Sequence, residues 1–437
     1  MVAERAAGAP ALAVLALALA GCGGGWRAPD LPPAPPPREV PPRPTTPHTP
    51  APPPDDLEQA PIDQPAPDVG AEPAPPAPRS APRGVAAESN YPIPRVWEWT
   101  LANGVHVWFR RSAGAPGQFV LRAAAPGGWR GLTGGAPADG TAPAGLRTSL
   151  RADETVAAAA GALSELPAVI DALAGLMAGT VPAGAVLSPD AALDAALAGA
   201  SPDARAAPAA LAARFGRPSD FRVVISGDVA PDTLIAMVGP RLSRLRTAPE
   251  ASIVTADSAA ALHAPRPRAI RHAGDGRGRR ALVAFRGAAT GPTAERRPDQ
   301  VRAGADVLAH ALLAAADAGP GARRSVAVDG RSITLIFEIA GDPEEATERV
   351  LRAAGALALA DAAVSRARGA AVDAHRREVQ RPEGWIEWLR FLSLSAADPR
   401  AAQEYAATLR AVPVERVRAL AQVLLDPARA AVVHVAD

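Results

Sequence analysis

Proline is distributed unevenly along this chain of 437 residues, and its distribution limits which part can fold. About half of the 48 prolines lie between Gly23 and Pro94, among alanine, aspartate and arginine. Such a segment cannot bury enough apolar surface to offset the conformational entropy lost on folding. We therefore predict that residues 22–90 form an extended, disordered spacer and that the folded region begins at residue 91.

The segment before the spacer is typical of an exported protein. The apolar run from Ala9 to Ala20 is shorter than the roughly 20 residues of a transmembrane helix, but it fits a secretory signal. The tetrad Leu19-Ala20-Gly21-Cys22 resembles the lipobox of bacterial lipoproteins, and Cys22 is the only cysteine. The resemblance implies a signal peptide over residues 1–21 and a lipid on Cys22, which anchors the protein in the bacterial envelope, facing the periplasm. Gly23-Gly24, in place of an acidic retention signal, favours the outer membrane over the inner. The alternative is an ordinary cleaved signal.

The charge balance gives no reason to expect a nucleic-acid partner. The formal net charge is +1, and all 46 basic residues are arginine, which we interpret as a composition bias together with the abundant Ala, Gly and Pro. The densest basic stretch, Arg277-Gly278-Arg279-Arg280, lacks the preceding strand and following helix of a phosphate-binding loop. We therefore predict no nucleic-acid partner and no cofactor.

Residues 91–247 predict a first unit of strands and helices. Apolar and polar residues alternate on both sides of Asn103-Gly104, which favours a hairpin with a two-residue turn. This turn would place Trp99 opposite Trp108, with Trp97 on the same face. The predicted elements are strands over Val96–Leu101, Val105–Arg110, Gln118–Ala125 and Phe221–Ile225, and helices over Glu154–Met177 (kinked at Pro167), Ala191–Leu197, Pro208–Phe215 and Pro231–Leu245.

Residues 269–437 repeat this pattern after a linker at 248–268. The predicted elements are strands over Ala281–Arg286, Ser325–Asp329, Ser332–Ala340 and Ala430–Val435, and helices over Asp299–Ala316, Pro343–Ala360, Ala362–Gln380, Trp385–Leu394 and Ala401–Leu425. In each unit strands come first, helices follow, and a strand returns at the end. This order predicts an α+β fold of two repeated units, each a mostly antiparallel sheet with helices on one face.

Three segments resemble those of a known family. Leu101-Ala102-Asn103-Gly104-Val105-His106-Val107 is similar to the hairpin that opens domains of the insulinase or pitrilysin-like zinc peptidases. Phe221-Arg222-Val223-Val224-Ile225-Ser226-Gly227-Asp228-Val229 is similar to that family's strand ending in G-D-V, and Leu409-Arg410-Ala411-Val412-Pro413-Val414-Glu415-Arg416-Val417 to its C-terminal pattern. The resemblance covers most of residues 91–437. It implies the insulinase-like metallopeptidase fold.

The family's zinc motif, H-x-x-E-H on a helix of the first unit, is absent. The first unit's only histidine is His106, and Leu132–Leu146, where the motif is expected, is rich in Gly, Ala and Pro. His375-Arg376-Arg377-Glu378-Val379 supplies a His and a Glu but has Val in place of the second ligand, and we interpret it as a solvated, charged helix face. Because catalytic zinc needs three protein ligands, we predict no metal site and no catalytic residue.

The family's second halves present an Arg and a Tyr that bind the substrate backbone. By resemblance Arg323 or Arg324 is the candidate for this Arg, but no Tyr follows, since the only tyrosines are Tyr91 and Tyr405. The resemblance thus implies a lipid-anchored, catalytically inactive homologue that binds extended peptide or partners an active insulinase-like peptidase subunit. Two alternatives remain: an envelope scaffold protein without a peptidase partner, and an active zinc peptidase whose ligands the sequence does not reveal.

Overall fold

The computed structural model describes residues 84–92, 94–112, 116–128, 138–151, 154–180, 183–186, 188–198, 214–246, 270–272, 276–288, 297–319, 321–329 and 332–436. All of them belong to one compact unit, Ala81–Asp437. The predicted leader with Cys22, the linker at 248–268 and most of the predicted helix at 208–215 lie outside the described residues. The first strand, β1 (Val85–Tyr91), begins before the predicted start of the folded region at residue 91.

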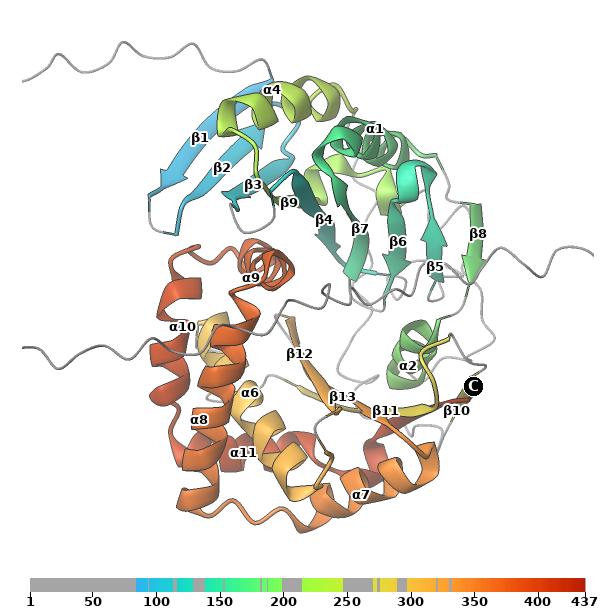
Figure 1. Cartoon of the computed structure of the whole chain (residues 1–437), viewed down its shortest axis with the longest axis vertical. Helices are drawn as coiled ribbons and strands as arrows, with labels where there is room; N and C mark the ends of the chain where they lie inside the picture. Colours follow the sequence, from blue (N-terminus) through green and yellow to red (C-terminus); the bar gives the residue numbers. More distant parts are fainter. Residues whose placement is uncertain are drawn as a thin grey trace, which may run out of the picture. The chain divides into compact units, whose positions relative to one another are not determined.

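The first half of the unit is built on one large sheet with helices α1 and α4 packed on a face of it (Figure 1). Its neighbouring strands are antiparallel except for the parallel pair β3 and β9. In spatial order the strands are β1, β2 (Val96–Leu101), β3 (His106–Arg111), β9 (Arg222–Gly227), β4 (Gln118–Pro126), β7 (Glu154–Ala162), β6 (Arg147–Leu150), β5 (Ala138–Thr141) and β8 (Ala183–Val186). The helices are α1 (Leu166–Met177) and α4 (Pro231–Leu242). Phe109, Leu121 and Ile170 lie in the buried core that the sheet forms with these helices.

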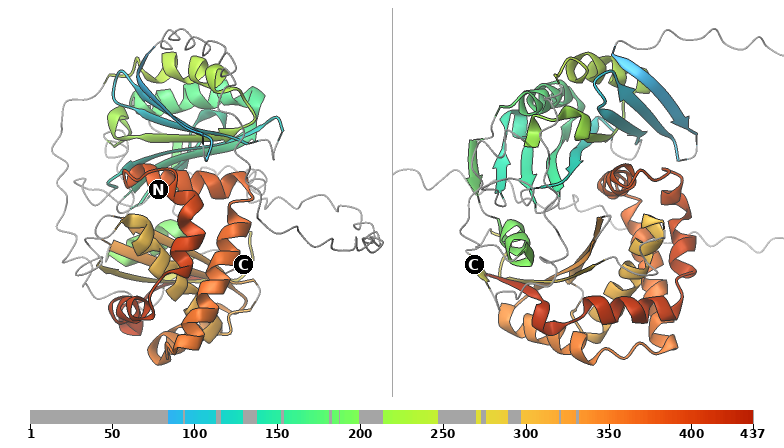
Figure 2. Two further views of the ribbon diagram at one scale, coloured as in Figure 1. Left: turned by 90° about the vertical axis from the view of Figure 1, so that its left-hand side faces the viewer. Right: turned by 180° about the vertical axis from the view of Figure 1, so that it is seen from behind.

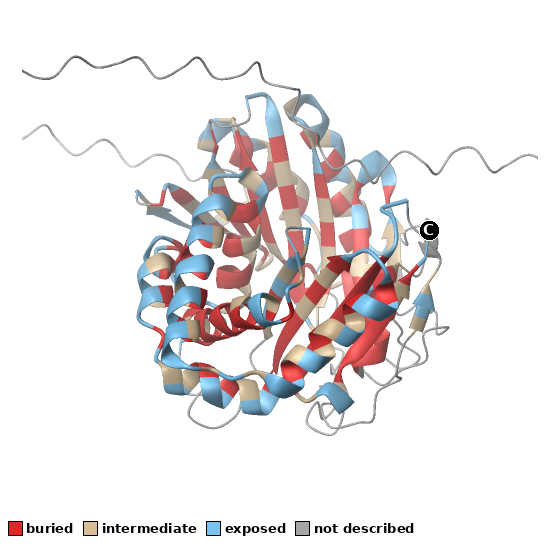
Figure 3. Ribbon diagram, turned by 60° about the horizontal axis from the view of Figure 1, so that its bottom comes forward, coloured by how far each residue is buried: buried red, intermediate tan, exposed pale blue. Residues whose placement is uncertain are grey.

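The second half has a five-stranded sheet and a larger set of helices. The strand order is β10 (Ile270–His272), β14 (Ala431–Val435), β11 (Arg280–Ala288), β13 (Ser332–Ala340) and β12 (Arg323–Asp329). The helices are α6 (Pro298–Ala315), α7 (Pro343–Ala356), α8 (Asp361–Glu378), α9 (Pro382–Leu394), α10 (Ala401–Arg410) and α11 (Val414–Leu424). Along α7, α8, α10 and α11 buried and exposed residues recur at helical spacing, so each presents one apolar side to the core, whereas α6 and α9 are buried over most of their length (Figure 3).

The two halves repeat one topology, which confirms the predicted α+β fold. In the first half the returning strand β9 lies between β3 and β4, parallel to β3 and antiparallel to β4. In the second half β14 lies in the same way between β10 and β11. By this correspondence β7 matches β13 and β6 matches β12. The segment between β4 and β6 therefore matches the segment between β11 and β12, which contains helix α6.

Each half also packs a helix against the other half's sheet (Figure 2). Helix α2 (Pro189–Ala198), which precedes β9 in the chain, buries Leu193 against Leu282 and Val433 of the second sheet. In return α9 packs against β4 and β9 of the first sheet. Two ion pairs hold α9 there: Arg122 Nε lies 2.5 Å from Glu387 Oε1, and Arg390 bonds Glu154.

The hairpin at Asn103-Gly104 forms, but its predicted register is wrong by one residue. Leu101 N donates to Val105 O at 2.8 Å, which closes a three-residue loop in which Gly104 has a φ of 85°. Trp99 therefore faces Val107, and Trp108 faces Glu98. Because a one-residue shift moves side chains to the opposite face, Trp108 does not share the face of Trp97 and Trp99. It joins the core beneath α9 instead.

Two predicted helices differ from the structure. Residues 154–162 of the predicted helix Glu154–Met177 form strand β7, and the helix begins only at Leu166. The alanines of this segment favour a helix locally, but every residue of β7 pairs with β4, so tertiary contacts override the propensity. The predicted helix Ala401–Leu425 is two helices, because Pro413 disfavours a helical conformation at Val412 before it.

Candidate functional site

The two arginines predicted to bind peptide lie at the start of β12 and differ in their surroundings. Arg323 is exposed. Arg324 is mostly buried: its Nη1 donates to Asp306 Oδ1 at 2.6 Å, and its Nε donates to His310 Nε2 at 2.8 Å. Arg324 is therefore part of an internal ion pair with α6, and Arg323 is the arginine that faces outward.

A tyrosine that is remote in the sequence shares a hydrogen-bond partner with Arg324. Tyr405 OH, on α10, donates to Asp306 Oδ2 at 2.6 Å, on the same carboxylate that Arg324 contacts. Tyr405 is 1% exposed, so it stabilises Asp306 and is not accessible to a substrate. The only sequence signal for this cluster is the four-residue spacing of Asp306 and His310, which puts both on one side of α6.

Charge and burial act in opposite directions on Asp306. Burial alone would raise the pKa of this carboxyl, but the charges of Arg324 and Arg302 and the hydrogen bond from Tyr405 outweigh it, and the pKa lies below its ordinary value. Burial, with the charge of Arg324, lowers the pKa of His310 to about 4. His310 is thus neutral at pH 7, as its role as acceptor of the Arg324 hydrogen bond requires.

His375, the first residue of the incomplete zinc motif, is not on a solvated helix face as predicted. It is 5% exposed and packs edge to face on Trp388 and Tyr405, with ring centroids 5.1 and 5.0 Å away. Burial lowers the pKa of His375 to about 4 and raises the pKa of Glu378. The apolar side of α8 faces α9 and α10, and His375 takes a core position because its ring packs there as an aromatic.

Acidification is expected to destabilise the protein through these two histidines. Both have a folded pKa of about 4 against an ordinary value of 6.5, so the unfolded chain binds more protons between these pH values. Stability should fall as the pH drops from 6.5 to 4, by up to about 3 kcal/mol for each histidine. Urea unfolding across this range measures it. His375→Phe keeps the ring packing and should make the free energy of unfolding depend less on pH. An unchanged pH dependence would contradict the lowered pKa of His375.

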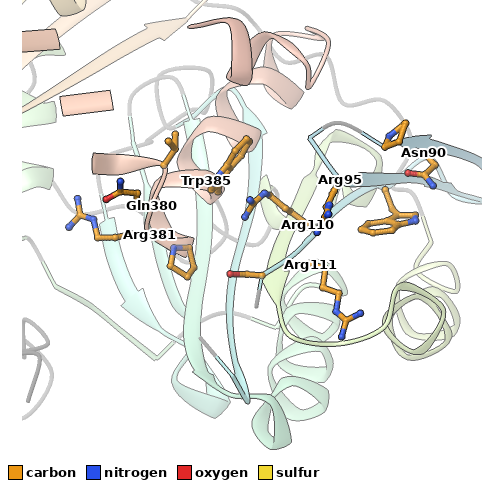
Figure 4. Close-up of a pocket in the computed structure, with 12 residues that line it drawn as sticks. Asn90, Arg95, Arg110, Arg111, Gln380, Arg381 and Trp385 are labelled. Atoms are coloured by element: carbon orange, nitrogen blue, oxygen red, sulfur yellow. The ribbon is translucent and has the colours of Figure 1, made fainter. Parts of the chain in front are cut away.

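A pocket of about 760 Å³ opens between the first hairpin and the turn from α8 to α9 (Figure 4). One wall comes from the ends of β1, β2 and β3, and the other from the turn and the start of α9. The lining residues are Asn90, Pro92, Arg95, Trp97, Arg110, Arg111, Ser112, Val379, Gln380, Arg381, Pro382 and Trp385. Four of them are arginines and none is acidic. The pocket is therefore a positively charged cavity that sequence order did not reveal.

The walls of this pocket are held by local backbone features. Arg95 has a φ of 64°, which turns the chain sharply between β1 and β2. On the other wall, a Cβ placed on Gly384 would lie 2.0 Å from the carbonyl oxygen of Glu378, so only glycine allows α9 to start so close to the end of α8. Arg110 lies with its guanidinium carbon 4.1 Å from the centroid of the Trp385 ring, which joins the two walls.

The donor set that the family's zinc requires does not fit this chain. No two histidines in the sequence are four residues apart. The segment between β4 and β6, which matches the position of α6, contains strand β5 among its described residues. Across the part of the chain that the structure describes, no three His, Cys, Asp or Glu residues are grouped so as to hold a metal ion. None of the described helices is long and apolar enough to cross a membrane.

Comparison with solved structures identifies the fold. A putative M16-like peptidase from Alicyclobacillus acidocaldarius has a TM-score of 0.51 and 14% identity, covering 78% of this chain and 98% of that one. The periplasmic protease PqqL from Escherichia coli has a TM-score of 0.48 and 13% identity, covering 80% of this chain. The present chain spans 46% of the length of PqqL. A peptidase M16 inactive domain from Pseudomonas fluorescens has a TM-score of 0.46 and 13% identity.

No family model matches the sequence, and no curated protein matches it. At these identities the likeness to solved structures shows the fold alone. The chain has the fold of the pitrilysin-like M16 peptidases, built from two repeated α+β units, as the hairpin and the G-D-V segment had indicated.

Proposed function

We propose that this protein is a non-catalytic, peptide-binding homologue of the insulinase-like peptidases. The observation that carries the proposal is the contrast between the two halves. Where the second half has helix α6, the described part of the matching segment in the first half contains strand β5 and a single 3-10 turn at Pro143–Gly145, and no α-helix. The motif that would hold zinc is also missing from the whole sequence. Without three ligands the fold lacks the means to activate a water molecule, while its sheets and pocket remain.

Two features support peptide as the ligand. Strand β12 is at one edge of the second sheet, so its outer backbone groups are available to pair with an extended chain, and Arg323 is exposed on it. The second feature is the pocket lined by arginines, since Arg95, Arg110 and Arg381 suit a ligand with negative charge. In this proposal Arg323 contacts the bound peptide, and Arg324 orients β12 through Asp306.

The purified protein is expected to hold no stoichiometric zinc and to cleave no peptide. The test is elemental analysis after incubation with zinc and removal of excess metal, followed by a peptidase assay on unstructured peptides. Finding about one zinc per chain, with activity that a chelator and Glu378→Gln both abolish, would overturn the proposal. A Glu383→Gln variant, which changes an exposed glutamate five residues away, serves as the matched control.

We also propose that Cys22 carries a lipid that anchors the protein in the envelope, because it is the last residue of a lipobox-like tetrad. Replacing Cys22 with Ser removes the thiol that would be acylated, so the protein should move from the membrane fraction to the soluble fraction. Fractionation of cells expressing each form measures this. Retention of the Cys22→Ser protein with the membranes contradicts the anchor. Ser80→Ala, which leaves the tetrad intact, is the control.

A further inference from the structure

The charge of the arginine pocket is not neutralised by the residues around it. Arg111 lies 3.4 Å from Asp228, but Arg95, Arg110 and Arg381 form no ion pair with any residue that the structure describes. Arg95 lies close enough to Arg110 for its charge to lower the pKa of Arg110. Three arginines thus line one cavity without a paired carboxylate, and only Arg110 among them is withdrawn from solvent, where an unpaired charge is unfavourable.

Arg110 is the most constrained of the three. Its Nε is buried and has no hydrogen-bond acceptor, and its guanidinium carbon lies 4.1 Å from the Trp385 ring centroid. Burial and the charge of Arg95 lower the pKa of Arg110, although the group stays protonated at neutral pH. An unsatisfied donor on a partly desolvated guanidinium is the kind of group that forms strong, charge-assisted hydrogen bonds to an incoming carboxylate.

The neighbouring features favour a carboxylate attached to a peptide. Trp97, Pro92, Pro382 and Trp385 give the pocket apolar surface beside the arginines. Its volume of about 760 Å³ is large enough for several residues rather than a single ion. The pocket also lies at the N-terminus of α9, whose first backbone N–H groups add a weaker attraction for negative charge.

We propose that this pocket binds a carboxylate of a peptide chain, with Arg95, Arg110 and Arg381 contacting the carboxylate and the two tryptophans contacting the adjoining residue. This inference rests on the proposed peptide-binding function and names the chemical group that is recognised. The carboxylate has two possible sources, the C-terminus of a peptide and an acidic side chain. Because the pocket is built from both halves of the unit, the bound peptide also links them.

The test is calorimetric titration of the folded protein with three N-acetylated alanine pentapeptides: the free acid, its C-terminal amide, and an amide with one alanine replaced by aspartate. Recognition of the C-terminus predicts that the free acid binds and that both amides bind at least about tenfold more weakly. Recognition of a side chain predicts that the aspartate-containing amide binds as well as or better than the free acid. Either result supports the proposal, and in both cases added salt should weaken binding.

Variants tie the binding to the pocket. Arg110→Met and Arg381→Met should each weaken binding of the preferred peptide at least about tenfold, because a charge-assisted hydrogen bond is lost. Arg366→Met, at an exposed position of α8 outside the pocket, should leave it unchanged. Circular dichroism checks folding. Arg110 packs on Trp385, so Arg110→Met could weaken binding by disturbing that packing. Arg381 is on the exposed turn, so the effect of Arg381→Met reports on the lost charge alone.

Two outcomes overturn the inference and are distinguishable. Equal binding of all three peptides, unaffected by Arg381→Met, rejects carboxylate recognition but leaves peptide binding standing. Absence of binding by all three peptides rejects both the inference and the proposed function.

Discussion

Replacing Asp306 with alanine is expected to lower the free energy of unfolding by about 3–5 kcal/mol, the cost of removing one partner of a buried ion pair. Asp306 accepts from Arg324 Nη1 and from Tyr405 OH, both at 2.6 Å, and Arg302 Nε lies 3.8 Å away. The variant leaves Nη1 of Arg324 and the hydroxyl of Tyr405 without their acceptor in the interior. Asp306→Asn keeps the shape and one acceptor oxygen, so its loss should be smaller.

Urea unfolding of the purified protein measures these changes. The matched control is Asp373→Ala on α8, where the carboxylate is 61% exposed and lies 3.5 Å from Arg376. An exposed pair of this kind contributes at most about 1 kcal/mol. A loss below about 1 kcal/mol for Asp306→Ala would contradict the ascribed role, because removing one member of a buried pair costs several times more.

Replacing Gly384 with alanine is expected to destabilise the protein by at least about 2 kcal/mol, even though alanine is the better helix former. The added Cβ would lie 2.0 Å from the oxygen and 2.6 Å from the carbon of the Glu378 carbonyl. These are backbone atoms, so the α8–α9 turn itself must move. Since this turn supplies Val379, Gln380 and Arg381 to the pocket, peptide affinity should fall together with stability.

Gly369→Ala is the control, and we expect it to stabilise the protein. Gly369 is exposed in the interior of α8, and a Cβ there meets nothing within 4 Å. That substitution should raise the free energy of unfolding by up to about 1 kcal/mol, the difference in helix propensity between the two residues. Thermal unfolding of both variants compares them directly. Stabilisation by Gly384→Ala would show that α8 and α9 are not in close contact at this turn.

Much of the fold could be predicted from local patterns. The alternation of apolar and polar residues predicted β2, β3 and β13, and helical spacing of apolar residues predicted α6, α8 and α9. In these elements the local residue pattern favours the secondary structure that the folded protein adopts. Strand β7 could not be found in this way. Its alanines are compatible with a helix, and only pairing with β4 makes residues 154–162 a strand. The register of the first hairpin was also decided outside the turn residues, by which face meets a core.

The candidate sites, too, could be predicted only in part from the sequence. The two arginines of β12 were found by resemblance, but the sequence did not reveal that Asp306 would bind Arg324 and also accept from Tyr405, since Tyr405 is far along the chain. The arginine pocket had no sequence signal, because Arg110 and Trp385 come from opposite halves. Long-range pairs of this kind depend on how the two units dock, and no local spacing encodes that.

The sequence by itself determined the presence of the first hairpin, most helices of the second half, the repetition of two units and the absence of an H-x-x-E-H motif, because periodicity and residue identity are local properties of a chain. Only the tertiary structure decided which helix covers which sheet, which arginine is paired and which is exposed, and where cations gather without acidic partners. The physical reason is that burial and electrostatic pairing depend on distances between residues remote in sequence.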